Sequence, residues 1–177
     1  METSAHSPVL NMLISDAMTG HMPAIHLRPF KPGDEAAFRS LNEAWIAKYF
    51  VIEPADRVVL ENPVANILRP GGHIFMALAE NRPVGCCALL PMGPGEFELA
   101  KMAVLEQERG RGIGRKVLEY AITQAKKLGA ERLYLETNRK LANAIHLYES
   151  VGFQHVSPEQ VIPSPYARAN VFMEMQI

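Results

Sequence analysis

The spacing of hydrophobic and polar positions along the chain switches several times between the two-residue period of a strand and the longer period of a helix. Residues 24–30 alternate and predict a first strand that ends at a proline. In the segment that follows, large apolar side chains recur at helical spacing, namely Phe38, Leu41, Trp45 and Tyr49. Asp34 stands just before them, where an N-cap residue belongs. This part of the chain therefore predicts a strand followed by an amphipathic helix.

The remaining elements are predicted in the same way. Pro54 and Pro63 each indicate the start of a short helix. A hairpin is expected at residues 71–92, and further strands at 95–105, 131–137, 152–156 and 169–177. One further helix is expected to follow the glycine-rich stretch and to end at a cap at Gly129, and another is expected at 139–150. This order indicates a mixed α/β domain at residues 23–177. Residues 1–22 show no clear period and are interpreted as an N-terminal extension with a short helix around residues 8–18.

Composition and charge narrow the class of protein. The 177 residues suit one domain, and 48% of them are hydrophobic and 21% charged, as in ordinary globular proteins. A formal net charge of -1 argues against a nucleic-acid or membrane-surface binder, and no apolar run approaches the roughly 18 residues of a membrane helix. The adjacent Cys86 and Cys87 cannot easily bridge each other, which favours the reducing cytoplasm. The six histidines show no metal-ligand spacing, so no metal is expected.

Three glycines alternate with other residues at the entrance of a predicted helix, at Gly110, Gly112 and Gly114. Glycine lowers helix stability, so its repetition there requires another explanation. A glycine-rich loop that opens a helix presents unpaired backbone N–H groups at the positive end of the helix dipole. Three cationic side chains surround it: Arg109, Arg111 and Arg115. The loop therefore predicts an anion site, with a phosphate or pyrophosphate as its natural ligand.

Two familiar phosphate loops do not match this stretch. The G-x-x-x-x-G-K-[ST] pattern of Walker loops is absent. The spacing of Gly110, Gly112 and Gly114 also departs from the dinucleotide pattern G-x-G-x-x-G, and too many strands precede it for an opening Rossmann unit. Taken alone, the loop leaves open both an anion site and a tight turn without a ligand.

The motifs of the chain resemble those of the GCN5-related N-acetyltransferase (GNAT) superfamily. Residues 109–114, RGRGIG, match the signature [QR]-x-x-G-x-[GA] of that family. Residues 98–104, ELAKMAV, resemble its fourth strand, and residues 144–153, AIHLYESVGF, resemble its later helix-to-strand segment. The resemblance covers about residues 25–177 in element order. It implies a GNAT fold of the α/β (α+β) class, with a mixed, mostly antiparallel sheet of about seven strands that is flanked by helices and splayed between strands 4 and 5.

The resemblance also implies a ligand for the glycine loop. In this family the loop binds the pyrophosphate of acetyl-coenzyme A (acetyl-CoA), which agrees with the anion site inferred from the residues. The loop and the start of its helix are then expected to hold it, namely Arg109, Gly110, Arg111, Gly112, Ile113, Gly114 and Arg115. Free backbone groups of Met102, Ala103 and Val104 are expected to pair with the pantetheine arm.

An asparagine contact with coenzyme A is less directly indicated. Many family members carry an asparagine at the position that Leu141 occupies here. Asn138 and Asn143 are the candidates to replace it, with a turn or helix cap as the alternative for Asn138.

The implied chemistry is acyl transfer from a thioester to an amine, which must lose a proton before it attacks. Tyr148 matches the tyrosine that the family often uses as general acid at the sulfur, although it also belongs to an apolar helical stripe. Glu98 is the candidate base, directly or through a water, with a solvated surface carboxylate as the alternative. Alternation along the strand predicts that Glu96 and Glu98 share one face, opposite Leu99 and Lys101.

For the acceptor, Trp45 and Tyr49 are candidates to line the substrate pocket, with a core stripe as the alternative, and Arg168 is a candidate to meet an anionic acceptor. The expected function is that of an acetyl-CoA-dependent N-acetyltransferase in the cytoplasm that acts on a small-molecule amine, of amino acid or polyamine type, in a ternary complex. A protein or peptide N-acetyltransferase and a non-catalytic acyl-CoA-binding sensor are the alternatives. The family also suggests a homodimer.

Overall fold

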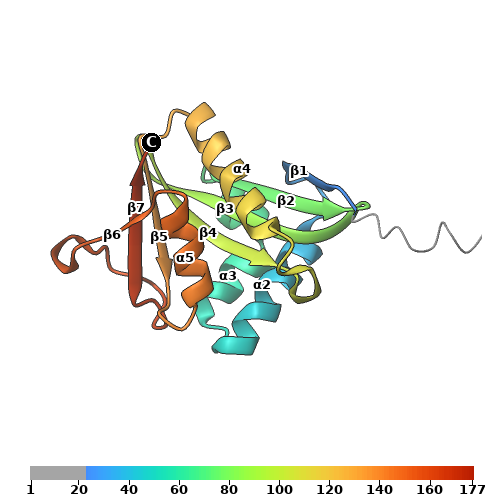
Figure 1. Cartoon of the computed structure of the whole chain (residues 1–177), viewed down its shortest axis with the longest axis horizontal. Helices are drawn as coiled ribbons and strands as arrows, with labels where there is room; N and C mark the ends of the chain where they lie inside the picture. Colours follow the sequence, from blue (N-terminus) through green and yellow to red (C-terminus); the bar gives the residue numbers. More distant parts are fainter. Residues whose placement is uncertain (1–22) are drawn as a thin grey trace, which may run out of the picture.

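The computed structural model describes residues 23–177, so the predicted N-terminal extension and its short helix lie outside the described residues. Within the described part, seven strands form one sheet in the order β1-β2-β3-β4-β5-β7-β6 (Figure 1). Their bounds are β1 Ile25–Pro29, β2 His73–Ala79, β3 Arg82–Gly93, β4 Glu96–Val104, β5 Arg132–Thr137, β6 Gln154–His155 and β7 Val171–Gln176. Neighbouring strands are antiparallel except β4 and β5, which are parallel. The predicted mixed, mostly antiparallel sheet is confirmed.

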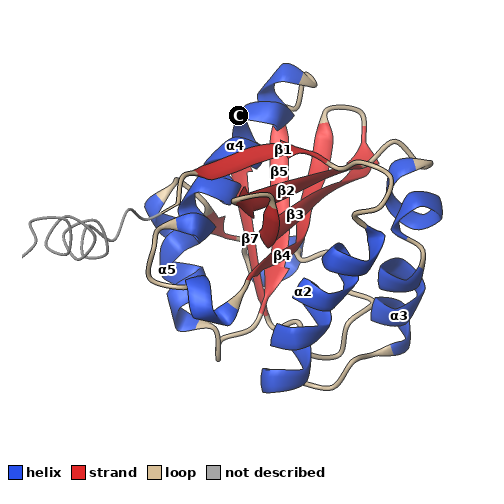
Figure 2. Ribbon diagram, turned by 90° about the vertical axis from the view of Figure 1, so that its right-hand side faces the viewer, coloured by secondary structure: helices blue, strands red, loops and turns tan. Residues whose placement is uncertain are grey.

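Helices cover both faces of this sheet (Figure 2). Their bounds are α2 Glu35–Tyr49, α3 Pro54–Glu61, the π-helix η1 Val64–Leu68, α4 Ile113–Lys127 and α5 Ala142–Ser150, with 3-10 turns at η2 Glu106–Glu108 and η3 Pro158–Gln160. Helices α2 and α3 lie on one face, and α4 and α5 on the other. Each face of the sheet has its own hydrophobic core. Alternate residues of β2 point to opposite faces, so Phe75 packs in the core on the α4 side and Met76 in the core on the α2 side.

Several local predictions are confirmed. Helix α3 begins at Pro54, and η1 follows Pro63 directly. Helix α4 ends in a Schellman motif, since Gly129 has a φ of 77° and the N–H of Ala130 donates to the carbonyl of Ala125 at 3.0 Å.

Two helix starts differ from the sequence predictions. Asp34 occupies the N-cap position of α2 but forms no side-chain cap, because its carboxylate accepts two hydrogen bonds from Arg28 at 2.6 and 2.9 Å. Helix α5 begins at Ala142 rather than near residue 139. The Asn138 side chain accepts a hydrogen bond from the N–H of Lys140 and holds that segment as a turn.

Strands β4 and β5 separate after a short paired stretch, as the fold predicts. Their register runs from Glu96 opposite Arg132 to Glu98 opposite Tyr134, while β4 continues to Val104. Beyond this stretch, the edge of β4 that faces β5 has no pairing with β5.

A β-bulge in β4 overturns the predicted alternation of its side chains. Between the pairs Cys86–Ala103 and Ala88–Ala100, β3 has one residue and β4 has two. Lys101 lies in this bulge with a φ of 51°, a left-handed conformation that is strained for a residue with a side chain. The bulge returns Lys101 to the face of Glu98, whereas Leu99 joins the core under α4.

Candidate active site

A cavity of about 400 Å³ opens where β4 and β5 separate. Its walls include most of the residues predicted to bind acetyl-CoA or the acceptor, namely Trp45, Tyr49, Glu98, Met102, Ala103, Val104, Arg109, Asn138, Asn143, Tyr148 and Arg168. The remaining predicted residues lie beside it, in the loop and the first turn of α4. The structure therefore brings together residues from α2, β4, the glycine loop, α5 and the loop before β7.

The glycine loop has the shape of an anion cradle. Gly110 and Gly112 have φ values of 78° and 72°, and a Cβ built at either position meets no atom within 4 Å. Gly112 is the N-cap of α4, so the first N–H groups of the helix have no partner within it. Ile113 is buried in the core and anchors the helix start. Open space, left-handed glycines and free N–H groups together suit a phosphate.

The three arginines of this loop are not equivalent. Arg109 lines the cavity, and its guanidinium donates to the Tyr49 hydroxyl at 3.3 Å. Arg115 is exposed and binds Ser150 at 2.7 Å. The Arg111 side chain instead pairs with Glu108 and donates to the carbonyl of Pro23. The Arg111 guanidinium is therefore engaged by Glu108, which differs from the prediction of three cationic side chains around the loop, while a role of its backbone stays a prediction.

Tyr148 lies at the bottom of the cavity on α5, with 8% of its surface exposed. Its hydroxyl donates to the sulfur of Met102 at 3.9 Å, and its ring meets Phe153 edge to face. Burial raises the pKa of Tyr148 above its usual value, so the hydroxyl keeps its proton at neutral pH. Tyr148 is thus both a buried core residue and a hydrogen-bond donor at the cavity.

Glu98 faces the same cavity from β4 and is half-buried. Burial raises the pKa of this carboxyl to about 7, with a further increase from the charge of Glu136 and an opposing effect of Lys101. A carboxyl group with this pKa exchanges a proton near neutral pH, which is what a general base requires.

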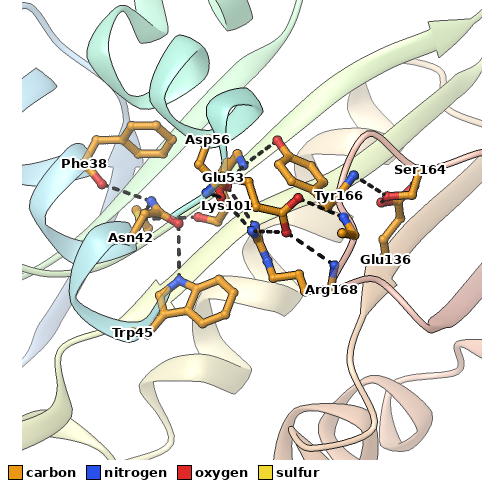
Figure 3. A network of polar contacts seen from close by, with 12 residues as sticks. Phe38, Asn42, Trp45, Glu53, Asp56, Lys101, Glu136, Ser164, Tyr166 and Arg168 are labelled. Atoms are coloured by element: carbon orange, nitrogen blue, oxygen red, sulfur yellow. Dashed lines mark hydrogen bonds and ion pairs between the residues drawn. The ribbon is translucent and has the colours of Figure 1, made fainter. Parts of the chain in front are cut away.

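A network of charged groups borders the cavity through Lys101, Tyr166 and Arg168 (Figure 3). Asp56 of α3 is fully buried and accepts two hydrogen bonds from Arg168, at 2.6 and 2.7 Å, and one from Lys101 at 3.0 Å. Burial favours a raised pKa for Asp56, but the hydrogen bonds from Arg168 and the charge of Lys101 outweigh it and hold the pKa below its usual value. Lys101 also donates to the Tyr166 hydroxyl at 2.7 Å.

This network fixes the segment between β6 and β7, residues 157–170, against α3. The backbone N–H of Ala167 donates to Glu53 at 2.8 Å, and the Arg168 side chain reaches the same carboxylate at 3.2 Å. On the other side of the segment, Ser164 donates to Glu136, and Asn138 donates to the carbonyl of Arg168 at 2.6 Å. These contacts therefore hold the segment in place as one wall of the cavity.

Trp45 and Tyr49 lie on the α2 side of the cavity. The buried amide of Asn42 accepts a hydrogen bond from the Trp45 indole at 3.5 Å and donates to the carbonyl of Phe38 at 3.0 Å (Figure 3). This chain of contacts fixes the indole, so Trp45 both packs against the core and lines the cavity, whereas Tyr49 lines the cavity but is exposed.

Sequence reasoning did not find Asp56, Glu136 and Tyr166, and it put Lys101 on the wrong face. Asp56 forms a capping box with Glu53, a pattern that signals a helix start rather than a site. The available signals for Lys101 and Glu136 were their charged side chains inside predicted strands, but both strands carry other charged residues as well. Tyr166 lies in a proline-rich loop without periodicity, and no local signal marks it.

Across residues 23–177, no group of three or more histidine, cysteine, aspartate or glutamate side chains is placed to hold a metal ion. No helix in that range is both long and apolar enough to cross a lipid bilayer.

Comparison with known proteins gives consistent matches. A model of the acetyltransferase (GNAT) family matches residues 35–153. The uncharacterized N-acetyltransferase YjgM of Escherichia coli K12 is 37% identical over 91 residues, which are 50% of this chain and 54% of that protein. The ribosomal protein bS18-alanine N-acetyltransferase of the same organism is 34% identical over 85 residues, 48% of this chain and 57% of that enzyme. The chain thus spans about half the length of these two relatives.

Solved structures share the fold. An acetyltransferase of the GNAT family from Staphylococcus aureus Mu50 superposes with a TM-score of 0.78 and 23% identity, over 86% of this chain and 99% of that one. The PaiA N-acetyltransferase of Thermoplasma acidophilum, solved in complex with coenzyme A, gives a TM-score of 0.69 and 19% identity, over 87% and 99%. At these identities the likeness shows the architecture of the sheet and helices.

Proposed function

The chain belongs to the acetyltransferase (GNAT) family, and we propose that it moves an acetyl group from acetyl-CoA to the amine of a small molecule, of amino acid or polyamine type. Transfer is direct, in a ternary complex of enzyme, donor and acceptor. One observation carries the proposal: Glu98 and Tyr148 line one cavity with the free edge of β4 and with Arg109 of the glycine loop. Its volume of about 400 Å³ lies in the range of small-molecule sites.

The donor has a matching surface. The N–H groups at the start of α4 receive the pyrophosphate, and Gly110 and Gly112 leave room for it. The pantetheine arm extends along Met102, Ala103 and Val104 and pairs with β4 as an added strand pairs with a sheet edge. A backbone N–H near Met102 is the candidate donor to the oxyanion of the tetrahedral intermediate.

The two candidate catalytic side chains divide the proton transfers. Glu98, directly or through a water, takes a proton from the substrate ammonium, and the free amine attacks the thioester carbonyl carbon. The carbon–sulfur bond then breaks. Tyr148 donates its proton to the departing sulfur, and coenzyme A leaves as a thiol. The proton that the nitrogen loses as it becomes the amide restores the tyrosine hydroxyl, so that one proton in total remains on Glu98. Positioning both substrates in one cavity supplies much of the remaining acceleration.

A protein or peptide acceptor is the second candidate, because one relative acts on the alanine of a ribosomal protein by its name. The segment 157–170 favours the small acceptor, because its contacts with Glu53 and Asp56 hold it in place beside the cavity. A sensor that binds acetyl-CoA without transfer is the third reading. The placement of Glu98 and Tyr148 at the cavity favours turnover over sensing.

The first test is calorimetric titration of the purified protein with acetyl-CoA, with ATP and NAD as controls. Saturable binding of acetyl-CoA alone is expected, followed by amine-dependent thiol release with a panel of amines and peptides. Absence of binding by the folded protein would refute the proposal. Binding with slow hydrolysis that no acceptor accelerates would leave the sensor.

A further inference from the structure

The positive charges at the acceptor end of the cavity already have partners. We use "acceptor end" for the part bordered by Glu98, Lys101, Glu136, Tyr166 and Arg168. Lys101, with 6% of its side chain exposed, and Arg168 both bind Asp56, and Arg168 also binds Glu53. The net charge of these two cations and two carboxylates is zero. No cation of this group is left to receive an anionic substrate.

Glu98 and Glu136 at the acceptor end have no such partners. Within residues 23–177 no ion pair or hydrogen bond reaches the Glu98 carboxylate, and Glu136 accepts a hydrogen bond from the uncharged Ser164 hydroxyl. Both lie on the α2 face of the sheet, because Leu133 and Leu135 of β5 point into the core under α4. The acceptor end therefore carries an excess of two carboxylates.

The surroundings of these carboxylates make their negative charge costly. Burial raises the pKa of Glu98 to about 7, with Glu136 adding to the increase and Lys101 opposing it. Burial also raises the pKa of Glu136, although the Ser164 hydrogen bond and the charges of Lys101 and Arg168 act in the opposite direction. A cation bound between them offsets that cost, whereas a second anion adds to it. From strand spacing and rise, their Cα atoms are about 8 Å apart or slightly more, because Glu136 lies two residues beyond the register partner of Glu98.

We propose that the acceptor is a small alkyl diamine, whose reacting amine meets Glu98 and whose second ammonium binds Glu136. The inference rests on the proposed function and deepens it, since it chooses the diamine over the amino acid. An amino acid brings a carboxylate to an end of the cavity where Arg168 and Lys101 are already bound to Asp56. The other cations of the cavity, Arg109 and Lys140, lie by Tyr49 and Phe50, away from Glu136.

Three matched amines test the inference on the unaltered protein. They are 1,5-diaminopentane, lysine, which adds one carboxylate to it, and pentylamine, which lacks its second ammonium; the four-carbon series 1,4-diaminobutane, ornithine and butylamine controls for chain length. The diamine is expected to have a kcat/KM at least about tenfold above both partners of its series, the size of one charge-assisted hydrogen bond. Lysine or ornithine used as well as its diamine would overturn the inference.

The variant Glu136→Gln tests the second contact. It is expected to raise KM for the diamine about tenfold with a smaller change in kcat, and to bring the diamine-to-monoamine ratio toward one. Glu96→Gln, on the same strand as Glu98 and paired with Arg132, is the control that leaves this ratio unchanged. A ratio that Glu136→Gln does not alter would refute the role of Glu136. If acetyl-CoA binds but no amine is acetylated, the proposed function itself fails.

Discussion

The two ends of the cavity are built in opposite ways. The proposed pyrophosphate site at the donor end is one continuous stretch of chain, residues 109–115, whose backbone N–H groups are expected to bind the anion. The acceptor end is assembled from side chains of α3, β4, β5 and the segment 157–170, held together by buried ion pairs. A site made of backbone depends on local conformation. A site made of distant side chains depends on charge balance, and so the two ends are expected to fail in different ways.

The largest effect is expected from removing the central carboxylate of the acceptor end. Asp56→Ala leaves Lys101 and Arg168 buried without their shared partner, and the expected loss in unfolding free energy is about 3–5 kcal/mol. Urea denaturation measures it. The control Glu43→Ala breaks the ion pair with Arg39 on the surface of α2 and is expected to lower the unfolding free energy far less, because water screens this pair. Equal losses in the two variants would mean that the network does not hold the acceptor end.

The second-largest effect is expected from removing the candidate general base. Glu98→Gln is expected to lower kcat about a hundredfold at neutral pH. Because the pKa of Glu98 is raised to about 7, its basic form fills as pH rises through 7, so the unaltered enzyme gains activity over that range. Glu136 interacts with it, so the rising limb belongs to the pair. A pH–rate profile should lose this limb in the variant and keep it in Glu96→Gln; an identical limb in both would remove Glu98 as the base.

A smaller effect is expected at the sulfur. Tyr148→Phe keeps the buried ring and removes the donor, so kcat should fall at least about tenfold while acetyl-CoA affinity barely changes. Steady-state rates and calorimetry separate the two quantities. Tyr120→Phe, on α4 against Phe75, is the control for loss of a tyrosine hydroxyl. Unchanged kcat in Tyr148→Phe would make this tyrosine a core residue alone.

The smallest effect compares two glycines of the same conformation. Gly112 and Gly33 both have left-handed φ values, 72° and 101°, with open space at the Cβ position. Alanine at either one is expected to cost about 1 kcal/mol of unfolding free energy from backbone strain. Only Gly112→Ala should also weaken acetyl-CoA binding, because its methyl group enters the proposed phosphate site. Equal affinity in both variants would place the pyrophosphate elsewhere.

The same contrast explains what the sequence could predict. The glycine loop, its helix and the cap at Gly129 were predicted because their signals lie within a few residues of the structures they form. The splay of β4 from β5 followed from the family resemblance. At the acceptor end, Lys101 binds partners 45 and 65 residues away in sequence. No periodicity encodes such a contact.

Three residues show where local rules were overruled. Alternation put Lys101 opposite Glu98, but a bulge with no glycine to mark it reversed the face. Asp34 had the sequence signal of a cap, and Arg28 bound its carboxylate instead. Arg168 was expected to meet an anionic acceptor, yet its guanidinium is bound to Asp56 and Glu53. In each case a charged partner or backbone irregularity outside the local window decided the outcome.

Because of the bulge at Lys101, the number of residues in β4 is expected to be more strongly constrained during evolution than the identity of its side chains. Substitutions of neighbouring side chains leave the extra residue in place, so the bulge is expected to persist when the amino acids of the strand change. Deletion of Met102 would let β3 and β4 pair without interruption at this point and would turn the Lys101 ammonium away from Asp56, whereas deletion of Lys101 would remove that ammonium. Relatives that share the acceptor end are therefore expected to align with this stretch without gaps, however far their side chains have diverged.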